Sequence, residues 1–428
     1  MKTAELDFRP FRAWRYDAKH VALDQVIAPP YDVISPQERE TLYQQSPFNV
    51  VRLILGKETD FHEQAAKRWQ EWTQKGALTQ DPSPVFYLYE QTFHHLWSGQ
   101  LLKRRALVGL LNLAHPEAVL AHEHTFSAPK KDRLLLLEKT KTNLSPIFGL
   151  YENSKNSLAG LFASYEKKPP LFEASDTQGS IHRGWAIQNR EEQQKIHETL
   201  SRGNILIADG HHRFETAVEY RRQMREKFPQ APPDSPFDFV MIALVEFSDE
   251  GLLMLPTHRI VKSFAPSSKK EFLDRAKQYF DFVPAEETKL FERLEKRPRS
   301  EKVFGGFFGA EGNFLLRLKD PKAVRSLLPA GKPDLWYENE ANLLSYFVFD
   351  RLWGTSGEAR QGLIEYTRSW EEAASAVRQG KAEAAFLMRS PEVADVLKLA
   401  EEGERMPQKT TYFYPKLASG LFFYHHKS

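Results

Sequence analysis

Residues 205–215 read ILIADGHHRFE, and this stretch decides how the chain folds around its polar residues. Residues 205–208 are apolar and mostly branched, which predicts a buried strand. From Phe214 onward the sequence lacks Gly and Pro and places apolar residues at helical spacing, so a helix is expected there. The residues DGHHR therefore lie where a strand ends and a helix begins.

The position of these five residues favours a functional site. The first amides of a helix have no partner within it, and the helix dipole makes its N-terminus attractive to anions. Gly210 permits a tight turn, and Arg213 offers a fork for phosphate or carboxylate. Asp209 could cap the helix, hold a metal or accept a proton, and His211 and His212 titrate near neutral pH. The structural alternative is a capping aspartate, two packing histidines and an arginine paired with a surface acid.

The composition limits the classes of protein. A chain of 428 residues predicts two or three domains, and 41% hydrophobic residues suffice for packed cores. The 59 basic residues nearly balance the 57 acidic ones, so no nucleic-acid partner is expected. Without cysteine there are no disulfides and no thiolate ligands, so a metal site would use His and carboxylates. No signal peptide or membrane-spanning stretch is evident, which predicts a cytoplasmic protein without a membrane partner.

Periodicity and turn residues predict an α/β (α+β) chain with a domain boundary near residue 265. Residues 1–265 form an N-terminal domain that carries the polar motifs, and residues 266–428 form a smaller α/β domain whose terminal loop could return to the site. Within the first domain we expect a helix starting at Ser35-Pro36 and a hairpin from residues 85–93 and 104–113. We also expect a strand at 50–55, a helix at 134–143, a β-α-β unit over 185–208, and a hairpin of 238–247 with 252–261.

Three further clusters of polar residues accompany DGHHR. Asp32 follows two prolines in a loop, where a turn aspartate is the structural alternative. In an extended segment His122 and His124 would face one side and Glu123 the other, although the spacing is not that of an HExxH zinc site. Basic residues and hydroxyls occur in KKDR at 130–133, in PTHR at 256–259 and near the C-terminus, where each could also be solvated surface. Phosphate loops, GxGxxG fingerprints and GxSxG elbows are absent from the sequence.

Taken together, these motifs resemble a large prokaryotic family known as domain of unknown function 1015. The resemblance rests on APPYDVIS, HEHT with the following KKDRL, SPIFGLY, IADGHHRFETA, LPTHR and MPQKTTYFYPKL, which occur in the family's order over nearly the whole chain. Family membership alone implies no defined activity.

The box ILIADGHHRFETA also resembles the GHHR or GERR box of the ParB and sulfiredoxin-like superfamily. This resemblance implies a ParB/sulfiredoxin-like N-terminal core with large insertions, in which a strand-to-helix turn holds nucleotide phosphates. Sulfiredoxin chemistry needs a cysteine at this box, and the DNA-binding partition proteins need a basic recognition helix downstream. Neither is present, which leaves the branch of free serine kinases.

The function we expect is therefore phosphoryl transfer from a nucleotide, ATP, ADP or CTP, to a small hydroxylated metabolite such as serine, with Mg²⁺ as cofactor. The oligomeric state is not predicted. The residues proposed for catalysis are Asp32, Glu123, Asp209 and His211. Those proposed to bind the nucleotide phosphates are Lys130, Arg133, Gly210, His212 and Arg213. Those proposed to bind the substrate are His122, His124, His258, Arg259, Lys409, Tyr412 and Lys416.

Two other functions remain open at this point. A nucleotide-binding regulatory switch would use the same phosphate cradle without a metabolite. A metal-dependent hydrolase would need His122, His124, His211 and His212 to meet in space.

Overall fold

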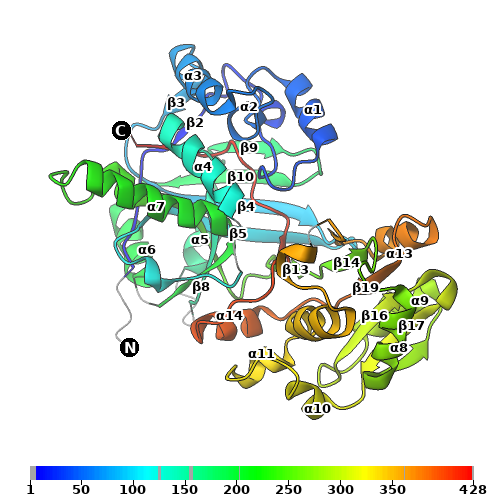
Figure 1. Ribbon diagram of the computed structural model, residues 1–428. Coiled ribbons are helices and arrows are strands. Elements are labelled where there is room, and N and C mark those ends of the chain that lie inside the picture. The colour runs from blue at the N-terminus through cyan, green and yellow to red at the C-terminus, as the bar shows by residue number, and fades with distance from the viewer. Residues whose placement is uncertain (1–5, 124–126, 154–157, 202, 361, 427–428) are drawn as a thin grey trace. The chain divides into compact units, whose positions relative to one another are not determined.

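A computed structural model describes residues 6–123, 127–153, 158–201, 203–360 and 362–426 (Figure 1). Its contacts define two compact units. Unit 1 comprises residues 1–121, 125–253 and 415–428, and unit 2 comprises residues 122–124 and 254–414. The sequence alone predicts a single boundary near residue 265, whereas each of these units takes in a short segment from elsewhere in the chain. None of the helices in the described ranges has the length and apolarity needed to cross a membrane.

Unit 1 is built on a nine-stranded mixed sheet in the order β6-β11-β8-β12-β5-β4-β10-β9, with β1 beside β5. The strands of this sheet are β1 (Phe8–Arg9), β4 (Phe86–His94), β5 (Leu101–Asn112), β6 (Val119–Leu120), β8 (Ile147–Tyr151), β9 (Phe172–Ser175), β10 (Ile181–Ile187), β11 (Ile205–Asp209) and β12 (Phe239–Glu246). Two small pairs join β2 (Trp14–Tyr16) with β3 (Leu78–Gln80) and β7 (Thr142–Asn143) with β21 (Tyr424–His425).

The helices of unit 1 complete two hydrophobic cores. They are α1 (Pro36–Gln45), α2 (Val51–Ile54), α3 (Phe61–Gln74), α4 (Ser127–Thr140), α5 (Ala159–Glu166), α6 (Arg190–Leu200) and α7 (His211–Lys227). One core packs α5, α6 and the start of α7 against the sheet, and the other joins α1, α2 and α3 with Phe423 from the C-terminal segment.

Unit 2 contains a six-stranded sheet in the order β15-β17-β16-β19-β14-β18. Its strands are β14 (His258–Val261), β15 (Phe280–Pro284), β16 (Val303–Phe307), β17 (Asn313–Leu318), β18 (Ile364–Thr367) and β19 (Ala384–Leu387), while β13 (Leu253–Leu255) pairs with β20 (Tyr412–Tyr414). Its helices are α8 (Lys269–Tyr279), α9 (Glu287–Glu295), α10 (Pro321–Arg325), α11 (Asp334–Glu338), α12 (Glu340–Asn342), the π-helix Leu343–Trp353, α13 (Trp370–Arg378) and α14 (Val393–Glu401). Apolar residues of α9 and α13 pack on this sheet.

Several elements predicted from the sequence are confirmed. The mixed α/β class is correct, β4 and β5 form the expected antiparallel hairpin, and β11 passes into α7 at Gly210. The helix α1 begins where Ser35-Pro36 predicts, and the Ser35 hydroxyl accepts a hydrogen bond from the Glu38 amide at 3.1 Å.

Two predictions of local structure are wrong. Residues 51–54 form the helix α2 instead of a strand, because the side chain of Asn49 accepts a hydrogen bond from the Val51 amide and starts the turn. The basic residues of KKDR lie in α4, which begins at Ser127, seven residues before the expected helix.

Two predictions of strand pairing are also wrong, because neighbouring strands already occupy the edges concerned. Both edges of β12 are taken by β5 and β8, so β13 and β14 pair with strands of unit 2 instead of forming a hairpin with β12. Likewise β10 lies between β4 and β9, and four strands separate it from β11, so the two do not form an adjacent β-α-β pair.

Candidate functional site

The junction between β11 and α7 presents the DGHHR residues at the start of a 17-residue helix. Gly210 adopts φ = 94°, a conformation that only glycine takes without strain, and it caps the helix without a side-chain hydrogen bond. A β-carbon at this position would lie 2.9 Å from the Arg213 guanidinium. The glycine is therefore needed both for the turn and for the close approach of Arg213.

Asp209 connects two cations across this junction. Its Oδ2 accepts a hydrogen bond from Arg213 Nη2 at 2.7 Å, and its Oδ1 forms an ion pair with Lys416. Burial would raise the pKa of Asp209, but the charges of Lys416 and Arg213 outweigh it and lower the pKa to about 2. Asp209 is therefore a poor proton acceptor at neutral pH, which argues against the catalytic role predicted for it.

Arg104 and Gln91 hold the C-terminal segment at this junction, and the sequence analysis missed both. Arg104 is buried on β5, donates to Gln91 Oε1 and to the Pro415 carbonyl, and stacks 4.7 Å from the Phe148 ring. The Gln91 amide donates to the Lys416 carbonyl at 3.0 Å. Burial lowers the pKa of Arg104 to about 10, against the charges of Tyr89, Asp249 and Asp209. Gln91 lies on β4 and Arg104 on β5, and both side chains are buried in apolar strands. A polar residue at an inward position of an apolar strand is the sequence signal that could have identified them.

Tyr31 and Arg133 bring the proline-rich loop and α4 to the same region of unit 1. The Arg133 guanidinium lies 4.1 Å from the centre of the Tyr31 ring and donates to the Ile54 carbonyl at 2.7 Å. Burial and the neighbouring Asp32 raise the pKa of Tyr31 to about 12, against the charges of Arg133 and Arg213. Asp32 itself is exposed.

A small cavity of about 60 Å³ opens beside this junction. Tyr31, Arg133 and Arg213 contribute to its lining together with apolar residues such as Leu136 and Ile147. The buried hydroxyl of Thr216 also lines it and has no hydrogen-bond partner among the described residues.

The remaining predicted residues of unit 1 are already engaged by protein contacts. Lys130 forms an ion pair with Glu215 at 3.0 Å, which joins α4 to α7. His211 is buried in the first turn of α7 and His212 is half-buried. Unit 1 thus contains Asp32, Lys130, Arg133, Asp209, Gly210, His211, His212, Arg213 and Lys416.

Unit 2 gathers the other predicted residues. His122 Nε2 lies 2.8 Å from the Thr411 hydroxyl, and that hydroxyl donates to Glu123 at 3.0 Å. Glu123 also bridges to Met406, so the histidine motif is tied to the chain that leads into β20. His124 lies outside the described residues. The Tyr412 ring lies 3.7 Å from the Arg368 guanidinium, and Lys409 occupies a turn at φ = 58°.

His258 and Arg259 are both buried on β14. His258 Nδ1 accepts a hydrogen bond from the Met388 amide at 3.1 Å, and its ring meets Phe291 edge-on. Burial and the charge of Arg259 lower the pKa of His258 to about 3. This neutral, enclosed ring fits a structural role in place of the substrate contact predicted for it.

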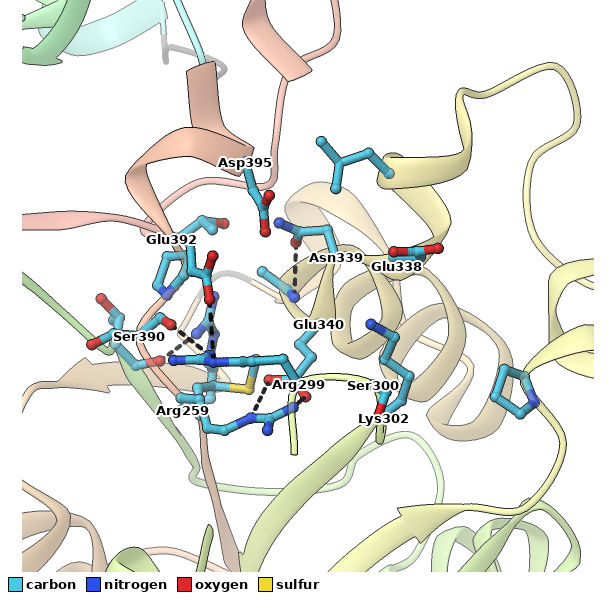
Figure 2. A pocket seen from close by; sticks show the side chains of 18 residues that line it. Arg259, Arg299, Ser300, Lys302, Glu338, Asn339, Glu340, Ser390, Glu392 and Asp395 are labelled. Carbon is cyan, nitrogen blue, oxygen red and sulfur yellow. Dashed lines mark hydrogen bonds and ion pairs between the residues drawn. The ribbon is translucent and has the colours of Figure 1, made fainter. Parts of the chain in front are cut away.

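A cavity of about 510 Å³ lies within unit 2 (Figure 2). Arg259 and Thr257 of the PTHR motif line it together with Thr410 of the C-terminal motif. Arg299, Lys302, Glu338, Glu392 and Asp395 supply further charges. The motifs that the sequence analysis assigned to one site therefore form two groups, one in each unit.

The described residues contain no group of three or more His, Asp or Glu side chains placed to hold a metal ion. Moreover, His122 belongs to unit 2, whereas His211 and His212 belong to unit 1.

Comparison with known proteins identifies one matching family model, described as a protein of unknown function (DUF1015), over residues 8–335. No curated protein matches the chain.

Three solved structures show a distant likeness. A conserved hypothetical protein from Pyrococcus furiosus is 15% identical, with 73% of this chain and 94% of that chain covered and a TM-score of 0.35. A free serine kinase mutant in complex with ADP is 12% identical, with 73% and 91% covered and a TM-score of 0.38. SbnI from Staphylococcus aureus, truncated at its C-terminus, is 9% identical, with 73% and 85% covered and a TM-score of 0.36. At these TM-scores the likenesses establish no function for this chain.

Proposed function

We propose that this chain, which belongs to the DUF1015 family of proteins of unknown function, binds nucleotide phosphates at the β11–α7 junction and transfers a phosphoryl group to a small hydroxylated metabolite. The observation that carries the proposal is the junction itself. Gly210 leaves the first amides of α7 without a side-chain cap, and Arg213 and Lys416 share the single carboxylate of Asp209. An uncapped helix start with two cationic side chains beside it is a ready anion site.

Phosphate binding would use the cations that Asp209 now neutralises. A phosphate that reaches the start of α7 would compete with Asp209 for Arg213 and Lys416, and with Asp132 for Arg133, which lies beside the Tyr31 ring. The resemblance of the GHHR box to the ParB and sulfiredoxin-like superfamily supports the same use of Gly210, His212 and Arg213. ATP, ADP and CTP all carry the required phosphates.

Transfer to a hydroxyl needs alignment, charge neutralisation and one positioned base. Among the predicted carboxylates of unit 1, Asp209 is held ionised between two cations, so we assign the base to the exposed Asp32. Mg²⁺ would enter with the nucleotide, since it keeps several water ligands and needs only one or two carboxylates. Serine is the first substrate to test.

Calorimetric titration with ATP, ADP and CTP, with and without Mg²⁺, tests the binding step. Arg213→Ala should weaken binding at least about tenfold, or about 1.4 kcal/mol, because it removes a charged fork from the helix start. Arg222→Ala is the matched control, since Arg222 lies on the same helix but pairs only with Glu219 and Glu226. Circular dichroism checks that both variants fold, and Lys416→Met provides a second variant that leaves α7 unchanged.

Two outcomes would change the proposal. If the wild-type protein binds none of the nucleotides, the phosphate cradle is wrong. If it binds one but forms no ADP in response to serine or another hydroxylated metabolite, the regulatory switch replaces the phosphotransferase.

A further inference from the structure

The cavity of unit 2 contains charges that the proposed phosphoryl transfer does not use. Its volume of about 510 Å³ lies within the range of small-molecule sites. Among the residues that line the cavity, Arg259 is the most informative about a ligand, because it is charged and only 4% of its surface is exposed. Buried charges are normally paired with an opposite charge, since an unpaired one is costly to remove from water.

Arg259 lacks such a partner. Its guanidinium donates to the carbonyl oxygens of Thr257 and Lys409 and lies 5.8 Å from the Tyr366 ring. No carboxylate of the described residues lies within ion-pair distance of it. The negative charge of Glu123 acts on it, but Glu123 accepts its own hydrogen bonds from Thr411. A buried guanidinium that donates to neutral carbonyls in a cavity wall is a favourable place for an anion to bind.

Arg389 lines the same cavity, and its positive charge is balanced by a carboxylate of the protein. It is equally buried, but it forms an ion pair with Glu340 and donates to the carbonyls of Arg297, Pro298 and Glu301. The protein therefore pairs one buried guanidinium with a carboxylate and, within the described residues, leaves the other with neutral carbonyl partners.

The remaining charges of the cavity have both signs. The side chain of Lys302 forms no hydrogen bond or ion pair within the described chain, and Figure 2 shows it extending toward Glu338. The carboxylates of Glu338 and Asp395 also lack a hydrogen-bonded partner there. Glu338 lies exposed at the end of α11.

A second carboxylate lies near Asp395. Figure 2 shows Asp395 directed toward Asn339, with Glu392 on the same side of the cavity. Burial and the charge of Glu392 raise the pKa of Asp395 against the charges of Lys398 and Lys302, although Glu392 itself lies 3.7 Å from Arg299. A positively charged group of a ligand would relieve this repulsion.

We propose that the cavity of unit 2 binds a small zwitterion of the amino-acid type. The anionic group of the ligand pairs with Arg259, with Lys302 supplying further positive charge. Its ammonium group pairs with Glu338 and Asp395. This binding is separate from the nucleotide site and does not depend on it.

The first experiment measures thermal unfolding of the full chain in the presence of each standard amino acid at about 10 mM, since a ligand that binds only the folded state raises the melting temperature. Calorimetry on the amino acid with the largest shift then gives its affinity. The same amino acid without its α-amino group, and without its α-carboxylate, should each bind at least about tenfold more weakly, because each lacks one ion pair.

Variants assign the two ends of the ligand. Arg259→Gln and Lys302→Met should weaken the parent amino acid and the analogue that keeps the carboxylate. Glu338→Gln should weaken the parent but leave the deaminated analogue unaffected. Lys296→Ala is the control, since Lys296 is exposed on the surface and pairs with Glu292. Glu338 and Lys302 are not buried, so these variants keep the test decisive if Arg259→Gln fails to fold.

Three results would overturn the proposal: no amino acid raises the melting temperature, both analogues bind as tightly as the parent, or the cavity variants bind like wild type. Nucleotide titration of the same variants should match wild type, which distinguishes failure of this site from failure of the phosphate site.

Discussion

Asp209 controls the charge balance at the β11–α7 junction. Its carboxylate accepts Arg213 and Lys416 at once, and these two cations lower its pKa to about 2 although burial opposes them. A phosphate that binds at this junction would compete with Asp209 for these two cations.

The same interaction makes the stability of the fold depend on pH. Because the folded pKa of Asp209 lies below its ordinary value of 3.8, its stabilisation is present above that value and is lost as the pH falls toward 2. We expect Asp209→Asn to lower the free energy of unfolding at pH 7 by about 2 kcal/mol or more. Urea unfolding at pH 7, 5, 4 and 3 should show this difference shrinking below about pH 4.

Asp60→Asn is the control for this experiment, since Asp60 is exposed and only accepts a hydrogen bond from Gln64. The unfolding free energy of Asp60→Asn should differ from that of wild type by the same amount at every pH. A gap between Asp209→Asn and wild type that stays constant down to pH 3 would show that the two cations do not depress the pKa of Asp209.

His258 gives unit 2 a pH dependence of its own. Its folded pKa of about 3 lies below the ordinary 6.5, so below pH 6.5 the unfolded chain binds a proton that the folded chain does not. Stability should fall by about 1.4 kcal/mol for each pH unit below 6.5. His258→Asn keeps an acceptor for the Met388 amide but cannot titrate, so between pH 7 and 5 it should lose about 2 kcal/mol less than wild type.

Calorimetric unfolding at pH 7, 6 and 5 measures this difference. His115→Asn should behave like wild type, because His115 is exposed and pairs only with Glu117. If the unfolding free energies of His258→Asn and wild type change equally with pH over this range, His258 is protonated in the folded protein.

At the residue scale, the sequence identifies the chemistry but not the partners. Asp209, Arg213 and Lys416 were all predicted to belong to a site, yet the ion pair of Asp209 joins residues 207 apart in the chain. Arg104 and Gln91, which hold the Lys416 segment, escaped prediction because they sit in strands whose pattern reads as core. Which residues pair over such sequence separations depends on the order of the strands in the sheet, and the spacing of residues along the chain does not reveal it.

Among the elements, the β11–α7 junction was predictable because periodicity changes there from strand to helix at a glycine. The four-residue helix α2 was not, since a short apolar run fits either state and only the Asn49 side chain, which accepts a hydrogen bond from the Val51 amide, distinguishes them. Strand partners were mispredicted where the edges of β10 and β12 were already occupied.

Gly210→Ala tests the junction as an element. The new β-carbon would lie 2.9 Å from the Arg213 guanidinium at φ = 94°, so both the turn and Arg213 must shift. We expect a loss of about 1–3 kcal/mol in stability and at least about tenfold weaker nucleotide binding. Gly179→Ala is the matched control, with φ = 82° and open space around it. It should lose stability but keep its nucleotide affinity, and equal effects of the two variants on affinity would contradict the proposed cradle.

For the whole molecule, the motifs divide between two units, although the sequence analysis assigned them to one site. Asp32, Arg133 and Lys416 gather with the DGHHR residues in unit 1, whereas Glu123, Arg259 and Tyr412 belong to unit 2. Sequence order does not reveal this division, because the chain leaves unit 1 for residues 122–124 and returns to it at residue 415.

The return of the chain makes the C-terminal segment part of the unit 1 fold. Leu421, Phe422 and Phe423 are buried, Phe423 packs in the core with α1, α2 and α3, and β21 pairs with β7. Removing a buried side chain of this size costs about 2–5 kcal/mol, so losing three exceeds the stability of most domains. A chain ending at residue 414 should therefore lose the calorimetric unfolding transition of unit 1 while keeping that of unit 2, whose last strand ends at Tyr414.

Complementation separates this structural role from the role of Lys416 in the site. A synthetic peptide of residues 415–428 should restore the transition of unit 1 and nucleotide binding together. The same peptide with Lys416→Met should restore the transition but leave binding at least about tenfold weaker, because the peptide keeps the buried aromatic residues and loses the cation beside Asp209. If the truncated chain unfolds like wild type without any peptide, the segment does not complete the core. If both peptides restore binding equally, Lys416 does not hold the phosphate.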